Sequence, residues 1–280
     1  MEHIQIALDK AKEKYGGSIR PVSGPARPGE SNGKGAEQAG RPAALANALP
    51  WLGLPVADLQ LRHLVRNRII TADKSNPAYA AFDRLRTRIL QEMRLQNWTT
   101  VAITSPTAGC GKSVVALNLA FSFGHQEECR TLAIDLDLAQ TRMADLLGLE
   151  GAPPLADFLS GRQSIQETLV RHGPNLAFGV NGRPLSYTSE LLQNASTRNV
   201  LTETRRELGP DIVIYDMPPL LCGDDTMAFL PNVDCVVLVA AAETSSFAEI
   251  DLCERELSEK SNLLGVVLNK CRYPQEMYGY

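Results

Sequence analysis

The sequence predicts an α/β protein with a doubly wound, mostly parallel β-sheet and helices on both faces. Two observations lead to this prediction. Short apolar runs alternate with helical stretches over most of the 280-residue chain. Several of these runs contain no polar position, as expected for strands buried on both faces. Repeated strand–helix units of this kind build a parallel sheet covered by helices on each side.

Composition and charge limit the classes of protein to consider. Hydrophobic residues make up 44% and charged residues 21% of the chain, and the net charge is −4, so no nucleic-acid partner is expected. The longest apolar run, residues 235–242, is far shorter than the roughly 20 residues of a membrane-spanning helix. No signal peptide is recognised, and the six cysteines form no CxxC pair. We therefore expect a cytoplasmic protein with reduced thiols.

The N-terminal part differs from the rest of the chain. Four apolar residues recur there at helical spacing and predict a short amphipathic helix: Ile4, Leu8, Ala11 and Tyr15. The following stretch is rich in glycine and proline and has almost no large apolar residues, which predicts a flexible linker. The predicted division is a helix, a linker, a main domain and a tail, at residues 1–15, 16–50, 51–272 and 273–280.

Within the main domain, a helix is predicted first, because Phe82, Leu85, Ile89 and Met93 recur at helical spacing. Asn76, followed by a proline, is a plausible start signal for this helix. Six strands are then predicted, at residues 99–104, 131–135, 176–180, 212–216, 235–240 and 264–269. Ligands of such sheets bind at the carboxyl ends of the strands, so chemistry is expected there.

The strongest motif is SPTAGCGKS, which follows the first predicted strand and opens a helix. Loop amides and a helix N-terminus in this arrangement cradle phosphate groups. Lys112 is expected to reach the β- and γ-phosphates, and the Ser113 hydroxyl to bind Mg²⁺. Pro106 stands where the strict GxxxxGK[ST] pattern has its first glycine. The predicted nucleotide-binding residues here are Thr107, Ala108, Gly109, Cys110, Gly111, Lys112, Ser113 and Val114.

A dinucleotide-binding fingerprint is the alternative interpretation of this loop. Gly109 and Gly111 begin a GxGxxG pattern, but Val114 replaces its third glycine. A lysine and a serine also stand where the pyrophosphate of NAD approaches the backbone. The sequence therefore favours a nucleoside triphosphate over NAD.

Acidic residues follow two other predicted strands. Asp135 ends the strand TLAID, Asp137 follows two residues later, and Asp216 ends IVIYD shortly before two prolines. Asp216 matches the acid that holds a Mg²⁺–water shell in enzymes with such phosphate loops. The first two acids are either part of the same metal–phosphate centre or a solvated pair in a loop, and the preceding phosphate loop favours the first interpretation.

The segments SPTAGCGKS, AIDLD and VIYDMPP together resemble the bacterial tyrosine kinases of polysaccharide export (BY-kinases), in the MinD-like branch of P-loop NTPases. The resemblance covers about residues 76–280 and includes PLADFLSG, GRPLSYTSELL and GVVLNK. The N-terminal part is similar to the version found with exosortase-type exopolysaccharide clusters. The resemblance implies a cytoplasmic, ATP-dependent protein-tyrosine autokinase that regulates exopolysaccharide or capsule polymerisation and export.

The resemblance also implies ATP and Mg²⁺ as cofactors and gives roles to single residues. Asp135 is implied as the base that accepts the proton of an attacking tyrosine. Ser113, Asp137 and Asp216 are implied to organise Mg²⁺ and its waters. Asn269, at the end of the last predicted strand, is implied to contact adenine. The implied catalytic set is Lys112, Asp135, Asp137 and Asp216.

The implied phosphate acceptors lie in the tail CRYPQEMYGY and are Tyr273, Tyr278 and Tyr280. The alternative is an aromatic tail that packs on the domain or stays loose. The implied activator is a membrane-embedded polysaccharide co-polymerase (chain-length regulator), which would place the kinase at the inner membrane. Self-association follows as a possibility, because the family phosphorylates its tails between neighbouring subunits.

Several positions depart from the family pattern. Ala139 occupies the arginine position of DxDxR, and Ala80 and Asp83 replace two residues of the ExxRxxR motif, of which Arg86 remains. These changes favour a competing hypothesis, an ATP-binding regulatory switch of the polysaccharide machinery with weak or no kinase activity. A scaffold that binds no nucleotide is a third possibility, disfavoured by the intact loop lysine and acids.

Overall fold

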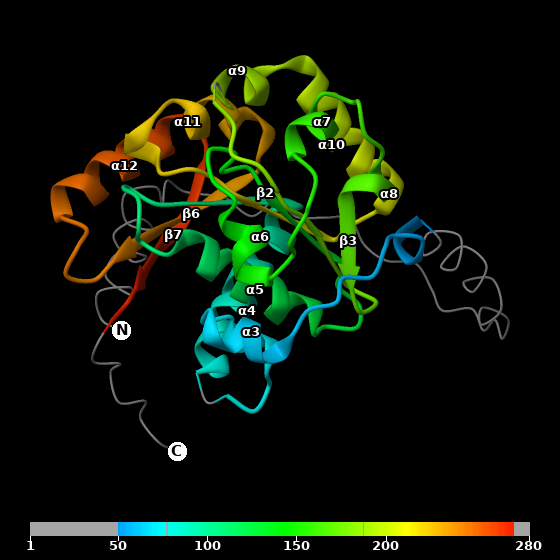
Figure 1. Ribbon diagram of the computed structural model, residues 1–280. Coiled ribbons are helices and arrows are strands. Elements are labelled where there is room, and N and C mark those ends of the chain that lie inside the picture. Colours follow the sequence, from blue (N-terminus) through cyan, green and yellow to red (C-terminus); the bar gives the residue numbers. More distant parts are fainter. Residues whose placement is uncertain (1–49, 77, 187, 272–280) are drawn as a thin grey trace, which may run out of the picture.

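In the computed structural model, which describes residues 50–76, 78–186 and 188–271, the strands form one sheet in the order β3-β4-β2-β5-β1-β6-β7 (Figure 1). All neighbouring pairs are parallel except β3 and β4. The bounds of the strands are β1 Thr100–Thr104, β2 Thr131–Asp135, β3 Leu169–His172, β4 Leu176–Gly179, β5 Ile212–Asp216, β6 Cys235–Ala241 and β7 Asn262–Asn269.

The predicted fold class and the six predicted strands are confirmed, with ends that differ by at most two residues. The additional strand, β3, lies at the sheet edge and pairs antiparallel with β4. Its last three residues are only partly buried and two of them, Arg171 and His172, are polar. An edge strand of this kind lacks the continuous apolar run by which the buried strands were recognised.

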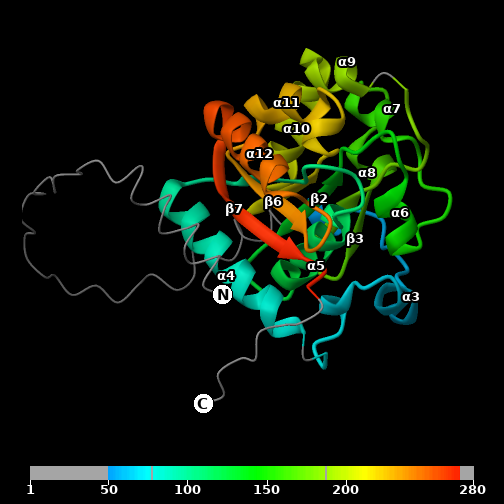
Figure 2. The ribbon, with the colours of Figure 1, turned by 90° about the vertical axis from the view of Figure 1, so that its left-hand side faces the viewer.

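The helices cover both faces of the sheet (Figures 1 and 2). Alternate residues of the strands contribute to two apolar clusters: Val101 and Ile103 to one, Ala102 to the other. This alternation follows from the two-residue repeat of a strand.

The helix bounds are α3 Leu61–Arg66, α4 Tyr79–Gln96, α5 Lys112–Gly124, α6 Arg142–Leu147, α7 Leu155–Leu159, α8 Ile165–Thr168, α9 Thr188–Gln193, α10 Ala195–Leu208, α11 Asp225–Phe229 and α12 Phe247–Lys260, with 3₁₀ turns η1 Ile70–Ala72, η2 Leu220–Cys222 and η3 Leu230–Asn232.

The segment before α4 is an integral part of the domain. Trp51 and Leu54 are buried in the same cluster as Ala102, and the backbone around Val56 pairs with Arg171 of β3. Further along, the Thr71 hydroxyl donates to the Asn118 carbonyl of α5 at 2.8 Å. The predicted N-terminal helix 1–15, nearly all of the linker and the tail 273–280 lie outside the described residues.

Helix α4, predicted from its apolar spacing, is confirmed and is tied to α5 by a polar cluster. Asp83 Oδ1 accepts hydrogen bonds from Arg86 Nη1 at 2.7 Å and from Ser122 Oγ at 2.8 Å. Arg86 Nη1 also donates to the Ser122 carbonyl at 2.9 Å. Asp83, which stands where the ExxRxxR motif has its first arginine, therefore finds its hydrogen-bond partners within its own chain. Among the described residues, no helix combines the length and hydropathy needed to cross a membrane.

Candidate nucleotide-binding site

The loop between β1 and α5 turns at the carboxyl end of the sheet. Gly109 has a φ of 82° and Gly111 a φ of 92°, both in the left-handed region that favours glycine. Gly111 is also the N-cap of α5, and its carbonyl accepts from the Val115 amide at 3.0 Å. The helix that follows is almost entirely buried, so its N-terminus is held in place at the carboxyl ends of the strands. These features match the predicted phosphate loop.

The second of these glycines is held against the end of β7. A Cβ atom at Gly111 would lie 2.4 Å from Asn269 Nδ2, whereas one at Gly109 would meet nothing within 4 Å. The Asn269 amide donates to the Cys110 carbonyl at 2.9 Å. Cys110 is buried, with its Sγ 3.5 Å from Ser245 Oγ. Asn269 therefore forms one wall of the loop, and its proposed contact with adenine stays a prediction.

We expect Gly111→Ala to weaken nucleotide binding by about tenfold or more, because Asn269 must leave the Cys110 carbonyl to make room. The overpacking should also cost about 1–3 kcal/mol of folding free energy. Gly109→Ala is the matched control, since it carries the same type of positive φ without a nearby side chain. Calorimetric titration with Mg²⁺–ATP and thermal denaturation would measure both effects. Equal losses in the two variants would show that backbone strain alone is responsible.

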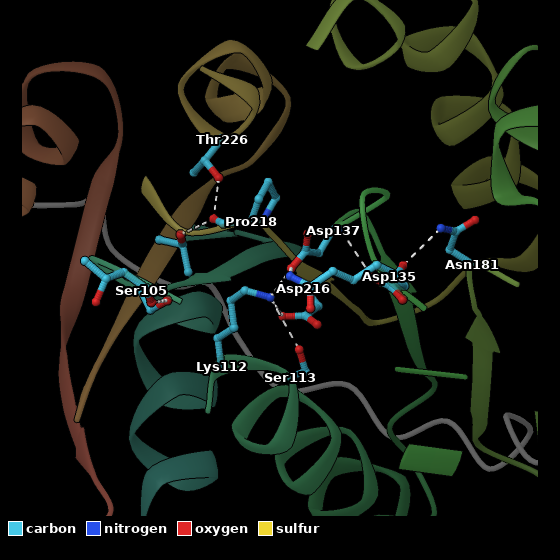
Figure 3. Close-up of polar contacts among 12 residues, drawn as sticks. Ser105, Lys112, Ser113, Asp135, Asp137, Asn181, Asp216, Pro218 and Thr226 are labelled. Atoms are coloured by element: carbon cyan, nitrogen blue, oxygen red, sulfur yellow. Dashed lines mark hydrogen bonds and ion pairs between the residues drawn. The ribbon is translucent and has the colours of Figure 1, made fainter. Parts of the chain in front are cut away.

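Lys112, the first residue of α5, points into a cluster of three aspartates (Figure 3). Its Nζ lies 2.6 Å from Asp137 Oδ2 and 3.7 Å from Asp216 Oδ1. The same Nζ is 3.4 Å from the hydroxyl of Ser113. The side chain of Lys112 is 9% exposed, that of Asp137 2% and that of Asp216 0%. The structure thus brings together residues that lie more than 100 positions apart in the sequence.

The third acid, Asp135, lies beside Asp216 because β2 and β5 are in register at these two residues. Both carboxylates are fully buried. Asp135 Oδ1 accepts from the Asp137 amide at 3.1 Å, while its Oδ2 and both carboxylate oxygens of Asp216 have no hydrogen-bond partner. Buried acceptors without partners are uncommon and costly. Apart from the ion pair of Asp216 Oδ1 with Lys112, these oxygens are free to accept from a ligand or to contact a cation.

Burial and mutual repulsion set the protonation of this cluster. Burial, reinforced by the charge of Asp216, raises the pKa of Asp135 well above its usual value. Burial also raises the pKa of Asp216, although Lys112 opposes the rise. For Lys112, burial favours the neutral form, but Asp216 and Asp137 together raise its pKa above the ordinary value. The single ammonium group does not offset the burial of Asp135 and Asp216, and a divalent cation bound beside them would favour their charged forms.

The sequence did not predict the residues that fix the backbone next to these acids. The hydroxyls of Thr104 and Thr226 both donate to the Pro218 carbonyl at 2.7 Å and fix the turn after Asp216. Asn181, after β4, contacts the backbone that follows Asp137. Such contacts join distant segments and belong to no linear motif, so single-sequence inspection has no signal for them. The predicted tail tyrosines lie outside the described residues.

A buried strand, a loop ending in Gly-Lys-Ser at a helix N-terminus, and acids at the ends of the neighbouring strands define a P-loop nucleotide-binding protein. Residues 101–278 match the family model of the CobQ/CobB/MinD/ParA nucleotide binding domain. The chain is 30% identical over 184 residues to the tyrosine-protein kinase CpsD of Streptococcus pneumoniae serotype 4, covering 64% of this chain and 79% of CpsD. The chain therefore belongs to the bacterial tyrosine kinases of this nucleotide-binding family.

Two further comparisons agree with this assignment. Over 207 residues the chain is 31% identical to EpsB of Ralstonia solanacearum, which is 73% of this chain but only 27% of EpsB. The chain thus spans about a quarter of the length of that relative. The kinase domain of the Escherichia coli tyrosine kinase ETK superposes with a TM-score of 0.66 at 26% identity, covering 76% of this chain and 84% of that domain. The predicted family resemblance is confirmed.

Proposed function

We propose that this protein is an ATP-dependent protein-tyrosine autokinase that regulates exopolysaccharide polymerisation and export. The observation that carries the proposal is the placement of Lys112 between Asp137 and Asp216, with Asp135 directly beside them. A phosphate loop faced by three acids provides the two requirements of phosphoryl transfer, positioning and charge neutralisation. The proposed acceptors are tyrosines of the C-terminal tail, Tyr273, Tyr278 and Tyr280.

The residues fit Mg²⁺ bound together with ATP. Among the described residues, no group of three or more His, Cys, Asp or Glu side chains is arranged to hold a metal ion by itself. Mg²⁺ commonly keeps several waters and takes its remaining ligands from one or two protein groups and the phosphates. Ser113, Asp137 and Asp216 would hold the ion in this way. The ion would supply neutralisation of the charge that develops on the phosphoryl oxygens.

Asp135 is the proposed base. Its raised pKa makes its carboxylate a better proton acceptor than an exposed aspartate. A tyrosine hydroxyl, with a pKa of about 10, benefits from such an acceptor during attack. Asp135 is fully buried here, so a tyrosine could reach it only after the residues around it move. Phosphates bound at Lys112 would compete with the Asp137 carboxylate and would favour such a rearrangement.

The direct test is autophosphorylation of the purified chain with Mg²⁺–ATP, read by phosphotyrosine detection and mass spectrometry. We expect wild-type signal on the tail and loss of that signal when Tyr273, Tyr278 and Tyr280 are all replaced by Phe. The triple variant should bind ATP as tightly as wild type, because the core is unchanged. Phosphotyrosine that persists in the triple variant would exclude the tail as acceptor.

The competing function is a nucleotide-dependent switch with weak or no kinase activity. Two observations favour it: Asp83 is engaged with Arg86 and Ser122 inside the chain, and Ala139 leaves the loop after Asp137 without the family's arginine. A protein that binds and slowly hydrolyses ATP but transfers no phosphate to tyrosine would support the switch.

The proposed location is the cytoplasm, at the inner membrane through a partner. The proposed partner is a membrane-embedded polysaccharide co-polymerase that activates the kinase, with self-association of the kinase as a second interaction. Co-purification with such a co-polymerase, dependent on residues 1–50, would test the first of these contacts. No nucleic-acid partner is proposed, since the net charge is −4.

A further inference from the structure

Asn181 is a fully buried amide whose polar atoms are all used. It lies just beyond the end of β4. Its Nδ2 donates to two backbone carbonyls, that of Leu138 at 3.0 Å and that of Gln140 at 3.1 Å. Its Oδ1 accepts from the Leu155 amide at 3.2 Å. Figure 3 shows this side chain directed at the segment that carries the first two acids.

That segment, which we call the acid loop, runs from residue 135 to residue 140. On the side of β5, the Leu136 amide donates to the Asp216 carbonyl at 2.8 Å. Within the loop, Asp137 is held by the Asp135 carboxylate, and the Gln140 amide donates to the Asp137 carbonyl at 3.0 Å. On the opposite side, the loop is held by Asn181 and by the Leu185 amide, which donates to the Leu138 carbonyl at 2.8 Å. The acid loop is therefore fixed between β5 and the end of β4.

We propose that Asn181 is a positioning residue, which holds the acid loop so that Asp137 reaches Lys112 and the metal–phosphate centre. The proposal rests on the proposed function, because it assigns Asn181 to the same site. Without the two Asn181 donors, the loop would keep its attachment to β5 and the hydrogen bond from the Leu185 amide to the Leu138 carbonyl at 2.8 Å, but lose both bonds to the end of β4. A displacement of about 1 Å in a group of this kind can reduce catalysis by about 100-fold.

The same strand provides a matched control. Asn175 precedes β4 and is 9% exposed. Its Nδ2 also donates to two backbone carbonyls, those of Gln126 and Glu127, both at 3.0 Å. These contacts lie at the opposite end of the strand from the phosphate loop. Asn175→Asp and Asn181→Asp thus remove the same pair of hydrogen bonds and add the same charge at the two ends of β4.

The experiment compares these two variants with wild type in thermal stability, in kcat and KM for ATP, and in the Mg²⁺ concentration that gives half-maximal activity. We expect both variants to lose stability. Asn181→Asp alone should reduce kcat by about tenfold or more and raise the Mg²⁺ requirement. KM for ATP should not rise, because the phosphate loop itself is intact and a displaced Asp137 competes less with the phosphates for Lys112. Asn181→Ala and Asn175→Ala, which remove the donors without adding a charge, replace the two aspartate variants if Asn181→Asp does not fold.

Equal effects of the two substitutions on kcat and on the Mg²⁺ requirement would overturn the proposal and leave Asn181 with a purely structural role. If wild type transfers no phosphate, the proposed kinase function fails but this test still works. In that case the readout is Mg²⁺-dependent ATP binding by calorimetry. A higher Mg²⁺ requirement in Asn181→Asp than in Asn175→Asp would support the positioning role, and equal requirements would reject it.

Discussion

Lys112→Met is expected to abolish Mg²⁺–ATP binding and phosphoryl transfer, because it removes the ammonium group that faces the predicted phosphate position. It should also destabilise the fold at neutral pH, since Asp137 and Asp216 would keep buried charges without the lysine. Breaking a buried ion pair by removing one partner costs about 3–5 kcal/mol. Calorimetric titration and denaturation at several pH values would measure the two effects.

The pH dependence of this destabilisation has a definite sign. Without Lys112, whose charge opposes the rise, the pKa values of the buried Asp135 and Asp216 rise further in the folded state. A carboxylate whose folded pKa is raised contributes stability below its unfolded pKa, near 3.9, and loses it as pH rises through the folded pKa. The stability gap between Lys112→Met and wild type should therefore widen from about pH 4 upward. Lys112→Arg, which keeps the charge, is the control; undiminished ATP binding by Lys112→Met would contradict the proposed site.

Asp135→Asn is expected to reduce phosphoryl transfer by about 10²–10⁴-fold, the usual contribution of a general base. ATP binding should persist, because Lys112 and Ser113 are unchanged. The same substitution should stabilise the protein at neutral pH, since it removes a buried charge that repels Asp216. For a domain of this size, each kcal/mol gained raises Tm by about 2–4 °C.

The stabilising effect should depend on pH in a known direction. Burial raises the folded pKa of Asp135, so in wild type the stability linked to this group is lost as pH rises from about 4 through the folded pKa. Asparagine does not titrate, and the advantage of Asp135→Asn should grow over that range. Asp251→Asn, which removes the same charge at an exposed position of α12, is the control. Normal transfer by Asp135→Asn would reject the assigned base.

How much the sequence predicts depends on the kind of signal each element carries. The six buried strands were predicted because their apolar runs are continuous. β3 was not predicted, because the polar residues Arg171 and His172 interrupt its apolar run. The role of Trp51 and Leu54 in the core was also missed, since they stand in a short mixed segment after the predicted linker. Their burial depends on the pairing of that segment with β3, which is a tertiary contact.

The site follows the same rule. Lys112, Ser113 and the three acids were predicted because each follows a strand or opens a helix in a recognisable motif. Their ion pairing was not predictable, since it depends on the register of β2 with β5. Asn181 escaped because its partners, Leu138 and Gln140, lie some 40 residues earlier in the chain. A contact between two loops leaves no periodic pattern in the sequence.

The ion pair between Lys112 and Asp137 has a consequence for how nucleotide affinity is set. The carboxylate is a tethered competitor of the phosphate, present at the lysine at a high effective concentration. The observed affinity for ATP is then the intrinsic affinity reduced by the fraction of molecules in which Lys112 is free. Any contact that draws Asp137 away from the lysine raises that fraction and tightens ATP binding, even if it lies remote from the nucleotide. In the proposed ATP site, the ion pair between Lys112 and Asp137 would therefore lower the affinity for ATP until the pair separates.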